Sequence, residues 1–186
     1  MSPREVLQRI IGVLNATGVP YMLTGSLASA YHGLPRATQD IDLVIAPSEG
    51  QLRELVARFR MPDHYVDEQT ALEAYRHESQ FNVLDLSTGW KIDFIIRRSR
   101  PFSRTEFERR TVVDFEGMPI AIARAEDVIL AKLEWARTGE SERQVEDAAG
   151  ILRVRAGELD LQYLDRWARE LQLEAQWEAA RRRSGA

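Results

Sequence analysis

The chain of 186 residues is long enough to bury a substantial core, and its hydrophobic content of 44% is ordinary for a globular protein. It contains no cysteine, which excludes disulfides and thiolate metal sites. Its net charge of −4 excludes attraction of nucleic acid by the molecule as a whole, and we expect no DNA partner. Because the sequence shows neither a signal-peptide core nor an apolar run of transmembrane length, we expect a cytoplasmic protein with no membrane partner.

The first part of the chain predicts a helix, a strand, a short helix and a second strand. Gly18 ends the first helix, Ser26 opens the second, and Pro47 breaks the second strand. Apolar residues recur at helical spacing in the first helix and form continuous runs in the strands. The four elements are expected at residues 2–17, 19–24, 27–32 and 40–46.

The middle of the chain predicts a third helix and two pairs of short strands. Ser48 is a good cap for the helix. The turns Ser87–Gly89 and Glu116–Gly117 each join two β-like runs. A polar stretch and a basic stretch are each expected to be a loop with a short helix, which in the basic stretch starts at Arg104. The strands are expected at 81–86, 91–96, 112–115 and 119–123, and the two stretches at 60–79 and 97–110.

From Ala125 onward the pattern is helical, with helices expected over residues 125–139 and 141–155 and one or two more over residues 160–183. The order of elements indicates an α+β fold with a small mixed β-sheet flanked by helices. We expect this core in residues 1–123 and a helical C-terminal subdomain in residues 124–186.

Two carboxylates lie on one face of the second predicted strand. Side chains alternate along a strand, so Asp40 and Asp42 share a face while Ile41 and Leu43 take the other. Two carboxylates on one face repel each other and are costly to desolvate unless a cation lies between them. Hard oxygen ligands suit Mg²⁺, which usually binds through one or two carboxylates and substrate phosphates. The pair therefore predicts a Mg²⁺ site for a phosphorylated substrate.

A phosphate site is expected upstream, where Gly25 and Ser26 follow the first strand and open a helix. The free backbone N–H groups and the positive end of the helix favour an anion there. The alternative is an ordinary turn with a helix cap, and for Gly-Ser alone this alternative would be preferred. The Asp pair that follows favours the phosphate site.

A third carboxylate is expected from a later strand. If the strand of Asp93 pairs beside the strand of Asp40 and Asp42, the three side chains can hold two divalent ions for in-line phosphoryl transfer. Asp85 is the competitor, and we prefer Asp93 because its strand is more apolar and better able to be central. The alternative for all of them is a capping or surface role.

Other polar residues are candidate phosphate contacts. Arg36 and Thr38 lie just before the Asp pair, where solvation of a loop is the alternative. Lys132 lies on a mostly apolar helix, where a lysine either extends to water or reaches an anion. Arg143 and Asp147 are one helical turn apart and are expected to form a surface pair.

These residues resemble a known family. The string Leu23-Thr-Gly-Ser26, then thirteen residues, Asp40-Ile-Asp42 and later Ile92-Asp93-Phe94 is similar to the DNA polymerase β-like nucleotidyltransferase superfamily. Together with His32-Gly33 and the stretch from Arg36, it looks most like the AbiEii-type abortive-infection toxin branch. The resemblance covers about residues 20–150, and its later part consists of Lys132 and the Arg143-to-Asp147 motif.

The resemblance implies a nucleotidyltransferase fold and the transfer of NMP from an NTP such as ATP to an acceptor hydroxyl, with Mg²⁺ and release of pyrophosphate. It implies that Asp40 and Asp42 hold two Mg²⁺ ions and that Asp93 completes one site and assists deprotonation of the acceptor. The implied phosphate contacts are Gly25, Ser26 and Lys132, and the further candidate nucleotide contacts are Arg36, Thr38 and Arg143. Because the branch is associated with toxin–antitoxin pairs, it also implies an RNA or protein acceptor and a cognate antitoxin.

Two alternatives stay open. The acceptor of the same reaction can be a small molecule, as in antibiotic-modifying nucleotidyltransferases, and an acidic cleft would favour this because aminoglycosides are cationic. The chain can also be a non-catalytic module that binds an NTP or a partner, because turnover additionally needs accurate placement of the reacting groups.

Overall fold

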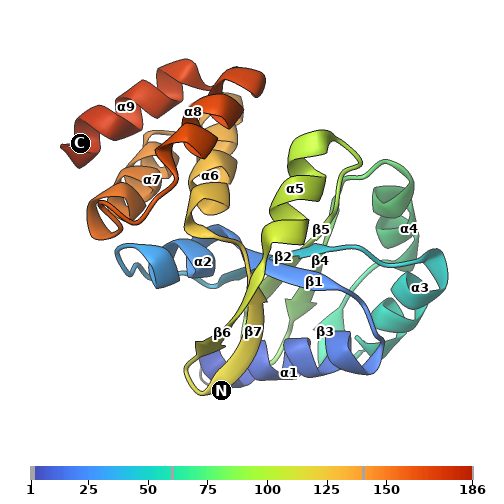
Figure 1. The fold of residues 1–186 in the computed structure, drawn as a ribbon. Coiled ribbons are helices and arrows are strands. Elements are labelled where there is room, and N and C mark those ends of the chain that lie inside the picture. Colours follow the sequence, from blue (N-terminus) through green and yellow to red (C-terminus); the bar gives the residue numbers. More distant parts are fainter. Residues whose placement is uncertain (1–2, 60, 140, 186) are drawn as a thin grey trace. The chain divides into compact units, whose positions relative to one another are not determined.

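The structure is a computed structural model that describes residues 3–59, 61–139 and 141–185. Its helices and strands follow one another along the chain as drawn in Figure 1. In order they are α1 (Pro3–Ala16), β1 (Tyr21–Thr24), α2 (Gly25–His32), β2 (Asp40–Ile45), α3 (Glu49–Arg58), β3 (His64–Tyr65), α4 (Glu68–Arg76), β4 (Gln80–Asp85), β5 (Lys91–Ile96), α5 (Pro101–Arg109), β6 (Thr111–Phe115), β7 (Met118–Ile122), α6 (Ala125–Gly139), α7 (Glu142–Val154), α8 (Leu161–Glu170) and α9 (Glu174–Ser184).

The chain forms two compact units. The sheet unit comprises Met1–Thr24 and Thr38–Ile122, and the helical unit comprises Gly25–Ala37 and Ala123–Ala186. The expected single boundary at residue 123 therefore needs one addition, because the segment 25–37 belongs with the C-terminal helices. The physical reason is that α2 packs against α6 and α7.

The sheet unit contains one seven-stranded mixed sheet with the order β3-β4-β5-β2-β1-β7-β6. The central strands β2 and β5 run parallel, β1 is antiparallel to β2, and β7 is parallel to β1. Three antiparallel pairs remain: β4 with β5 and β6 with β7 are the expected hairpins, and β3 pairs with β4 at the edge of the sheet. The expected small mixed sheet flanked by helices is therefore confirmed.

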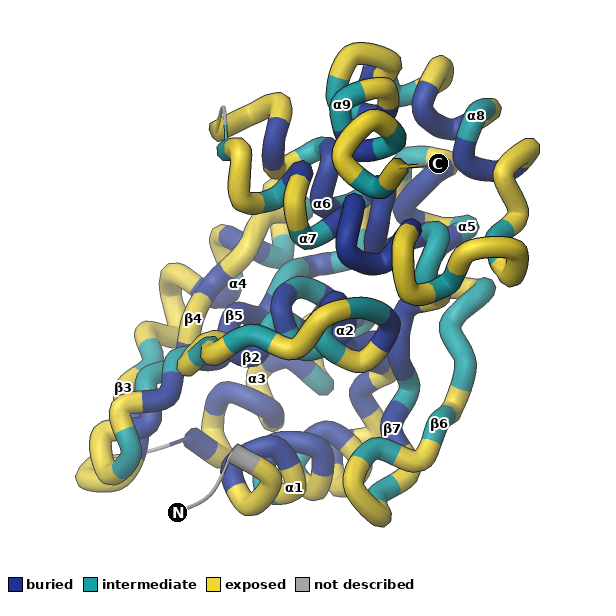
Figure 2. The backbone as a smooth tube through the Cα atoms, turned by 90° about the vertical axis from the view of Figure 1, so that its left-hand side faces the viewer, coloured by how far each residue is buried: buried dark blue, intermediate teal, exposed yellow. Residues whose placement is uncertain are grey.

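The core of the sheet unit lies on one face of the sheet, where α1 runs across the strands (Figure 1). Figure 2 shows that buried residues continue through the central strands and along one side of α1. The rings of Phe59, Phe81 and Phe94 meet there, with centroids 5.3–6.0 Å apart. The other fully buried members are aliphatic: Leu7, Ile10, Leu14, Ile41, Leu43, Ile45 and Ile92.

The helical unit packs its helices around a second apolar core. Helix α7 lies against both α6 and α9, and α8 packs on α6. Gly33, just after α2, allows a close approach, because a Cβ there would lie only 3.0 Å from the backbone nitrogen of Ile151 on α7. The core side chains are Ile129, Leu133, Ile151, Leu164, Trp167, Leu173 and Trp177.

Two local expectations differ from the structure. The polar stretch 60–79 contains, besides the expected short helix α4, a two-residue strand, β3, which pairs with β4. Such a short strand has no periodicity of its own and forms only through its partner. Helix α5 begins at Pro101 and not at Arg104, because proline is well suited to the first turn of a helix. None of the helices within the described residues is long and apolar enough to cross a membrane.

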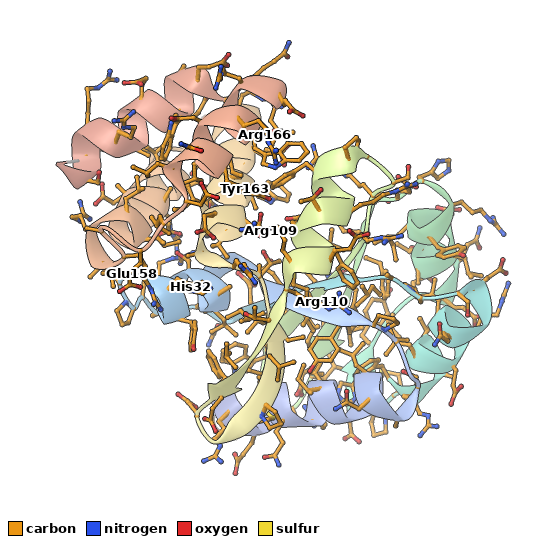
Figure 3. The ribbon with its side chains drawn as sticks, in the orientation of Figure 1. His32, Arg109, Arg110, Glu158, Tyr163 and Arg166 are labelled. Atoms are coloured by element: carbon orange, nitrogen blue, oxygen red, sulfur yellow. The ribbon has the colours of Figure 1, made fainter. Side chains whose placement is uncertain are left out.

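A buried histidine fixes α2 within the helical unit. The Nε2 of His32 lies 2.8 Å from the carbonyl oxygen of Ala123 and donates to it, while its buried Nδ1 finds no hydrogen-bond partner in the described part of the chain (Figure 3). Burial lowers the pKa of His32, and the hydrogen bond to Ala123 opposes this shift. Protonation would therefore place a charge in a site that cannot solvate it.

We expect the free energy of unfolding to fall as the pH drops below about 6.5. In that range the unfolded state binds a proton that folded His32, with its lowered pKa, does not bind. The variant His32→Gln keeps an N–H donor but does not titrate, so its stability should depend less on pH. Urea unfolding between about pH 7.5 and 5.5 measures the difference between the two proteins. Burial also lowers the pKa of His64, which contributes equally to both.

The matched control is His77→Gln, because His77 is exposed at the end of α4. This variant should retain the pH dependence of the wild type. An equal pH dependence in His32→Gln and the wild type would contradict the assignment.

Candidate functional site

The three expected carboxylates lie on one face of the central strands. In the parallel pair of β2 and β5, Asp42 is opposite Asp93 and Asp40 is opposite Lys91. Directly opposed residues point to the same face, as do residues two apart on one strand. Asp40, Asp42 and Asp93 therefore share a face, which we call the acidic face, and fully buried residues such as Leu43 and Phe94 take the other.

The acidic face is held by four neighbouring strands. Thr24 of β1 is opposite Asp42, and Asn82 of β4 is opposite Asp93, so one row of polar side chains crosses β1, β2, β5 and β4. Solvent access increases along the carboxylates: the Asp93 side chain is 12% exposed, Asp42 is half-buried and Asp40 is exposed. Asp42 and Asp93 have paired strands on both sides and Asp40 is paired with Lys91, so the backbone spacing of the carboxylates is set by the sheet.

A lysine ammonium group lies within the acidic face. The Nζ of Lys91 is 2.7 Å from Oδ2 of Asp93. This hydrogen bond raises the pKa of Lys91, partial burial opposes the shift, and the charges of Asp93, Asp40 and Asp42 add to it. The ammonium group of Lys91 therefore shares this face with all three carboxylates.

The competing carboxylate, Asp85, lies on the opposite face. In β4 it lies two residues after Val83 and four after Phe81, so it shares their face, which is buried in the core. Asp85 is itself only 1% exposed. Its Oδ2 accepts a hydrogen bond from Arg9 of α1, and its Oδ1 accepts from Ser87 and Thr88. Burial raises the pKa of Asp85, but these hydrogen bonds and the charge of Arg9 outweigh it and lower the pKa to about 2. Asp85 is therefore a structural carboxylate that ties α1 to the turn after β4.

The donor set of the acidic face fits a divalent cation. The carboxylate oxygens are hard ligands, they are partly open to solvent, and a cation already lies beside Asp93. As the side chains stand, no three of His, Cys, Asp or Glu are grouped to hold a metal ion within residues 3–59, 61–139 and 141–185.

Several of the expected nucleotide contacts meet at Asp147 in the helical unit. Asp147 itself was not expected to contact the nucleotide. Asp147 of α7 accepts through Oδ2 from Nζ of Lys132, at 2.9 Å, and from Nε of Arg36, at 3.2 Å. Arg36 also donates to the hydroxyl of Ser26. These four residues form what we call the Asp147 network. Lys132 is only 4% exposed, so the alternative that its side chain extends to water is excluded.

The turn from β1 into α2 has the expected form. Strand β1 ends at Thr24 and α2 starts at the next residue, Gly25, without a loop. Gly25 has a φ of +63°, in the left-handed region where glycine is favoured. Ser26 follows and is buried, with its hydroxyl bonded to Arg36.

The remaining expected contacts have local roles or lie on the surface. The hydroxyl of Thr38 accepts from the backbone N–H of Asp40, at 3.1 Å, at the start of β2. Arg143 is exposed on α7. The expected pair of Arg143 with Asp147 is replaced, because Asp147 points to Arg36 and Lys132.

Sequence reasoning missed the roles of Lys91 and Asp147. One signal was available for both: Lys91 and Lys132 are the only lysines in a chain that otherwise uses arginine. Each lysine pairs with a buried or half-buried aspartate, Lys91 with Asp93 and Lys132 with Asp147.

No protein-family model matches the sequence, and none of the curated proteins matches it. Solved structures do match. The antibiotic-resistance factor ANT(2'')-Ia has 14% identity and a TM-score of 0.59, over 94% of this chain and 96% of that one. The lincosamide antibiotic adenylyltransferase LnuA, solved with lincomycin bound, has 11% identity and a TM-score of 0.56, over 83% of this chain and 98% of that one. The chain has the nucleotidyltransferase fold.

A third nucleotidyltransferase-fold structure agrees with this result. A Thermotoga maritima protein, described as a candidate nucleotidyltransferase, has 18% identity and a TM-score of 0.51 over 91% of this chain and 96% of that one. The nucleotidyltransferase fold expected from the resemblance is therefore confirmed. The acidic face and the Asp147 network are two features of this fold as the present chain builds it.

Replacing Asp147 by Asn should destabilise the protein by about 3 kcal/mol, because Lys132 would keep a buried charge without its carboxylate. The matched control is Glu146→Gln, which removes the neighbouring carboxylate of an exposed pair with Arg153 and should cost less than about 1 kcal/mol. Urea unfolding measures both. Adding Lys132→Met to Asp147→Asn should recover part of the loss, and purely additive effects would contradict the pairing.

Asp85 should stabilise the fold above about pH 4, and this contribution should be lost as the pH falls toward about 2. The carboxyl group has a folded pKa of about 2, below the ordinary aspartate pKa of about 3.8, so the unfolded state takes up its proton first. The stability difference between the wild type and Asp85→Asn should therefore shrink by about 2 kcal/mol across this range. Thermal unfolding at several pH values tests this, with Asp114→Asn on exposed β6 as the control. A constant difference would exclude the assigned ion pair.

Proposed function

We propose that the protein is a Mg²⁺-dependent nucleotidyltransferase that transfers NMP from an NTP to an acceptor hydroxyl and releases pyrophosphate. The observation that carries this proposal is the register of β2 and β5, which sets Asp42 opposite Asp93 with Asp40 on the same face. Three carboxylates at this spacing, in a chain with the nucleotidyltransferase fold, fit the binding of divalent cations together with a triphosphate.

In the proposed reaction the acceptor oxygen attacks the α-phosphorus of the NTP. The bond from the acceptor oxygen to phosphorus forms, the bond to the pyrophosphate oxygen breaks, and the hydroxyl proton passes to a carboxylate. Asp40, Asp42 and Asp93 would hold Mg²⁺, which would neutralise the phosphate charge and activate the attacking oxygen. Asp93 is our candidate proton acceptor, because it is the least exposed of the three carboxylates.

The Asp147 network is our candidate anion-binding site within the helical unit. Arg36 and Lys132 carry two positive charges against the single negative charge of Asp147, so the network retains a net positive charge for an anion. Ser26 offers a hydroxyl next to Arg36, and Gly25 opens the helix whose first N–H groups favour phosphate. Thr38 and Arg143 remain further candidates from the resemblance.

For the acceptor we propose a chemical class and not a particular molecule. The resemblance to the AbiEii-type branch favours an RNA or protein acceptor and an antitoxin partner. A small cationic acceptor is the second candidate, for two reasons. Two similar structures are an antibiotic-resistance factor and an antibiotic adenylyltransferase, and they match over 96% and 98% of their own length. The net charge of −4 also favours a cationic substrate.

Transfer of α-³²P label should depend on the acidic face. Each NTP is incubated with Mg²⁺, the protein and a lysate separated into RNA, protein and small-molecule fractions. Asp42→Asn and Asp93→Asn should each lower the transfer at least about a hundred-fold, because each removes a charged ligand at the reacting centre. Asp85→Asn is the matched control on the opposite face and should stay within a few-fold of the wild type once its folding is verified.

The outcomes separate the candidates. Label in one fraction that disappears with Asp42→Asn establishes the reaction and names the acceptor class. Binding of an NTP without label in any fraction would favour the non-catalytic module. Equal loss in Asp85→Asn and Asp93→Asn, with both proteins folded, would contradict the assignment of Asp93.

A further inference from the structure

Lys91 is the first residue of β5 and projects onto the acidic face. It is opposite Asp40 on β2 and two residues before Asp93 on its own strand. Both relations place its side chain on the same face as the carboxylates. The consequence is the contact of 2.7 Å between Nζ of Lys91 and Oδ2 of Asp93. The position of this ammonium group is therefore fixed by the same register that gathers the carboxylates.

The charges on this face are unequal. Three carboxylates share this face with the ammonium group of Lys91. Without any cation, neighbouring carboxylates repel and raise the free energy of the folded state. The ammonium of Lys91 lowers this repulsion, and it does so at Asp93, the carboxylate with the least access to water.

The lysine can also leave its place. Its side chain is 41% exposed, whereas that of Asp93 is 12% exposed. Four rotatable bonds separate the ammonium from a backbone that is hydrogen-bonded between β2 and β4. The ammonium can therefore move into solvent or toward another anion while the strands and the carboxylates stay in position.

We propose that Lys91 is a tethered counter-ion that occupies Asp93 in the metal-free protein and must be displaced from it before a divalent cation can bind there. The inference rests on the proposed function, because it concerns the same acidic face. It assigns Lys91 a positioning role: the ammonium group offsets the repulsion among the carboxylates in the metal-free state and sets the affinity of the face for the incoming ion.

The proposal predicts competition between Lys91 and the metal. A divalent ion at Asp93 meets an ammonium group that already holds the carboxylate, so the measured affinity includes the free energy of displacing it. Removing the ammonium should therefore strengthen metal binding. If Lys91 only supported the fold, its replacement would weaken metal binding or leave it unchanged, because the loss of its contacts would loosen the site.

The experiment is a titration of the full chain with Mn²⁺ in the absence of nucleotide, with free Mn²⁺ followed by electron paramagnetic resonance. Lys91→Met keeps the apolar stem and removes the charge, and it should bind Mn²⁺ roughly ten-fold more tightly than the wild type. Lys91→Arg keeps the charge and should remain near the wild-type affinity. Arg53→Met removes the cation of an exposed ion pair in the same unit and should change nothing.

Thermal unfolding supplies a second measurement. In EDTA, Lys91→Met should melt below the wild type, because its carboxylates have lost their counter-ion. Saturating Mn²⁺ should raise its melting temperature by more than it raises that of the wild type. This comparison also shows whether the variant folds.

The outcomes distinguish this inference from the proposed function. Binding of Mn²⁺ by the wild type that is lost in Asp42→Asn supports the metal site itself. If Lys91→Met then binds Mn²⁺ with wild-type or weaker affinity while Lys91→Arg is unchanged, the counter-ion role is overturned and the metal site stands. If neither the wild type nor Lys91→Met binds Mn²⁺, the proposed metal site and the counter-ion role both fail.

Discussion

The pairing of β2 with β5 is the constraint on which the rest of the structure depends. Side chains alternate along both strands, so one register decides at once which residues enter the core and which form the acidic face. A slip by one residue would bury Asp93 and expose Phe94, which is fully buried here. The apolar residues that hold the register, such as Ile41 and Ile92, therefore also hold the carboxylates opposite each other. The same strand register therefore determines both the packing of the core and the geometry of the acidic face.

Alternation predicted part of the acidic face. It placed Asp40 and Asp42 on one side of a strand, and it can also separate the two candidates for the third carboxylate. Asp85 follows the apolar residues Phe81 and Val83 at steps of two residues, which places it on their face, the core side. Asp93 is instead flanked by the buried residues Ile92 and Phe94, so its side chain points away from the core. The sequence does not show that β5 pairs with β2, because strands distant in the chain have no local signal for their partner.

The Asp147 network shows where local rules do not suffice. The spacing of one helical turn predicted that Asp147 pairs with Arg143. In the structure its partner Arg36 is 111 residues away, and Lys132 reaches it from another helix. The same long-range packing moves α2 from the N-terminal core into the helical unit. The order of elements along the chain does not reveal that the early segment 25–37 packs with the helices after residue 122.

The discontinuous helical unit has a consequence for synthesis. The chain passes between the two units three times, after residues 24, 37 and 122. Helix α2 leaves the ribosome early, but α6 and α7, which cover it, follow only after the whole sheet unit has been made. Its buried side, which includes Ala28 and His32, therefore stays uncovered while most of the chain is translated. The helical unit can thus be completed only after the sheet unit has been made, and a chain that stops at residue 123 would keep α2 without its packing partners.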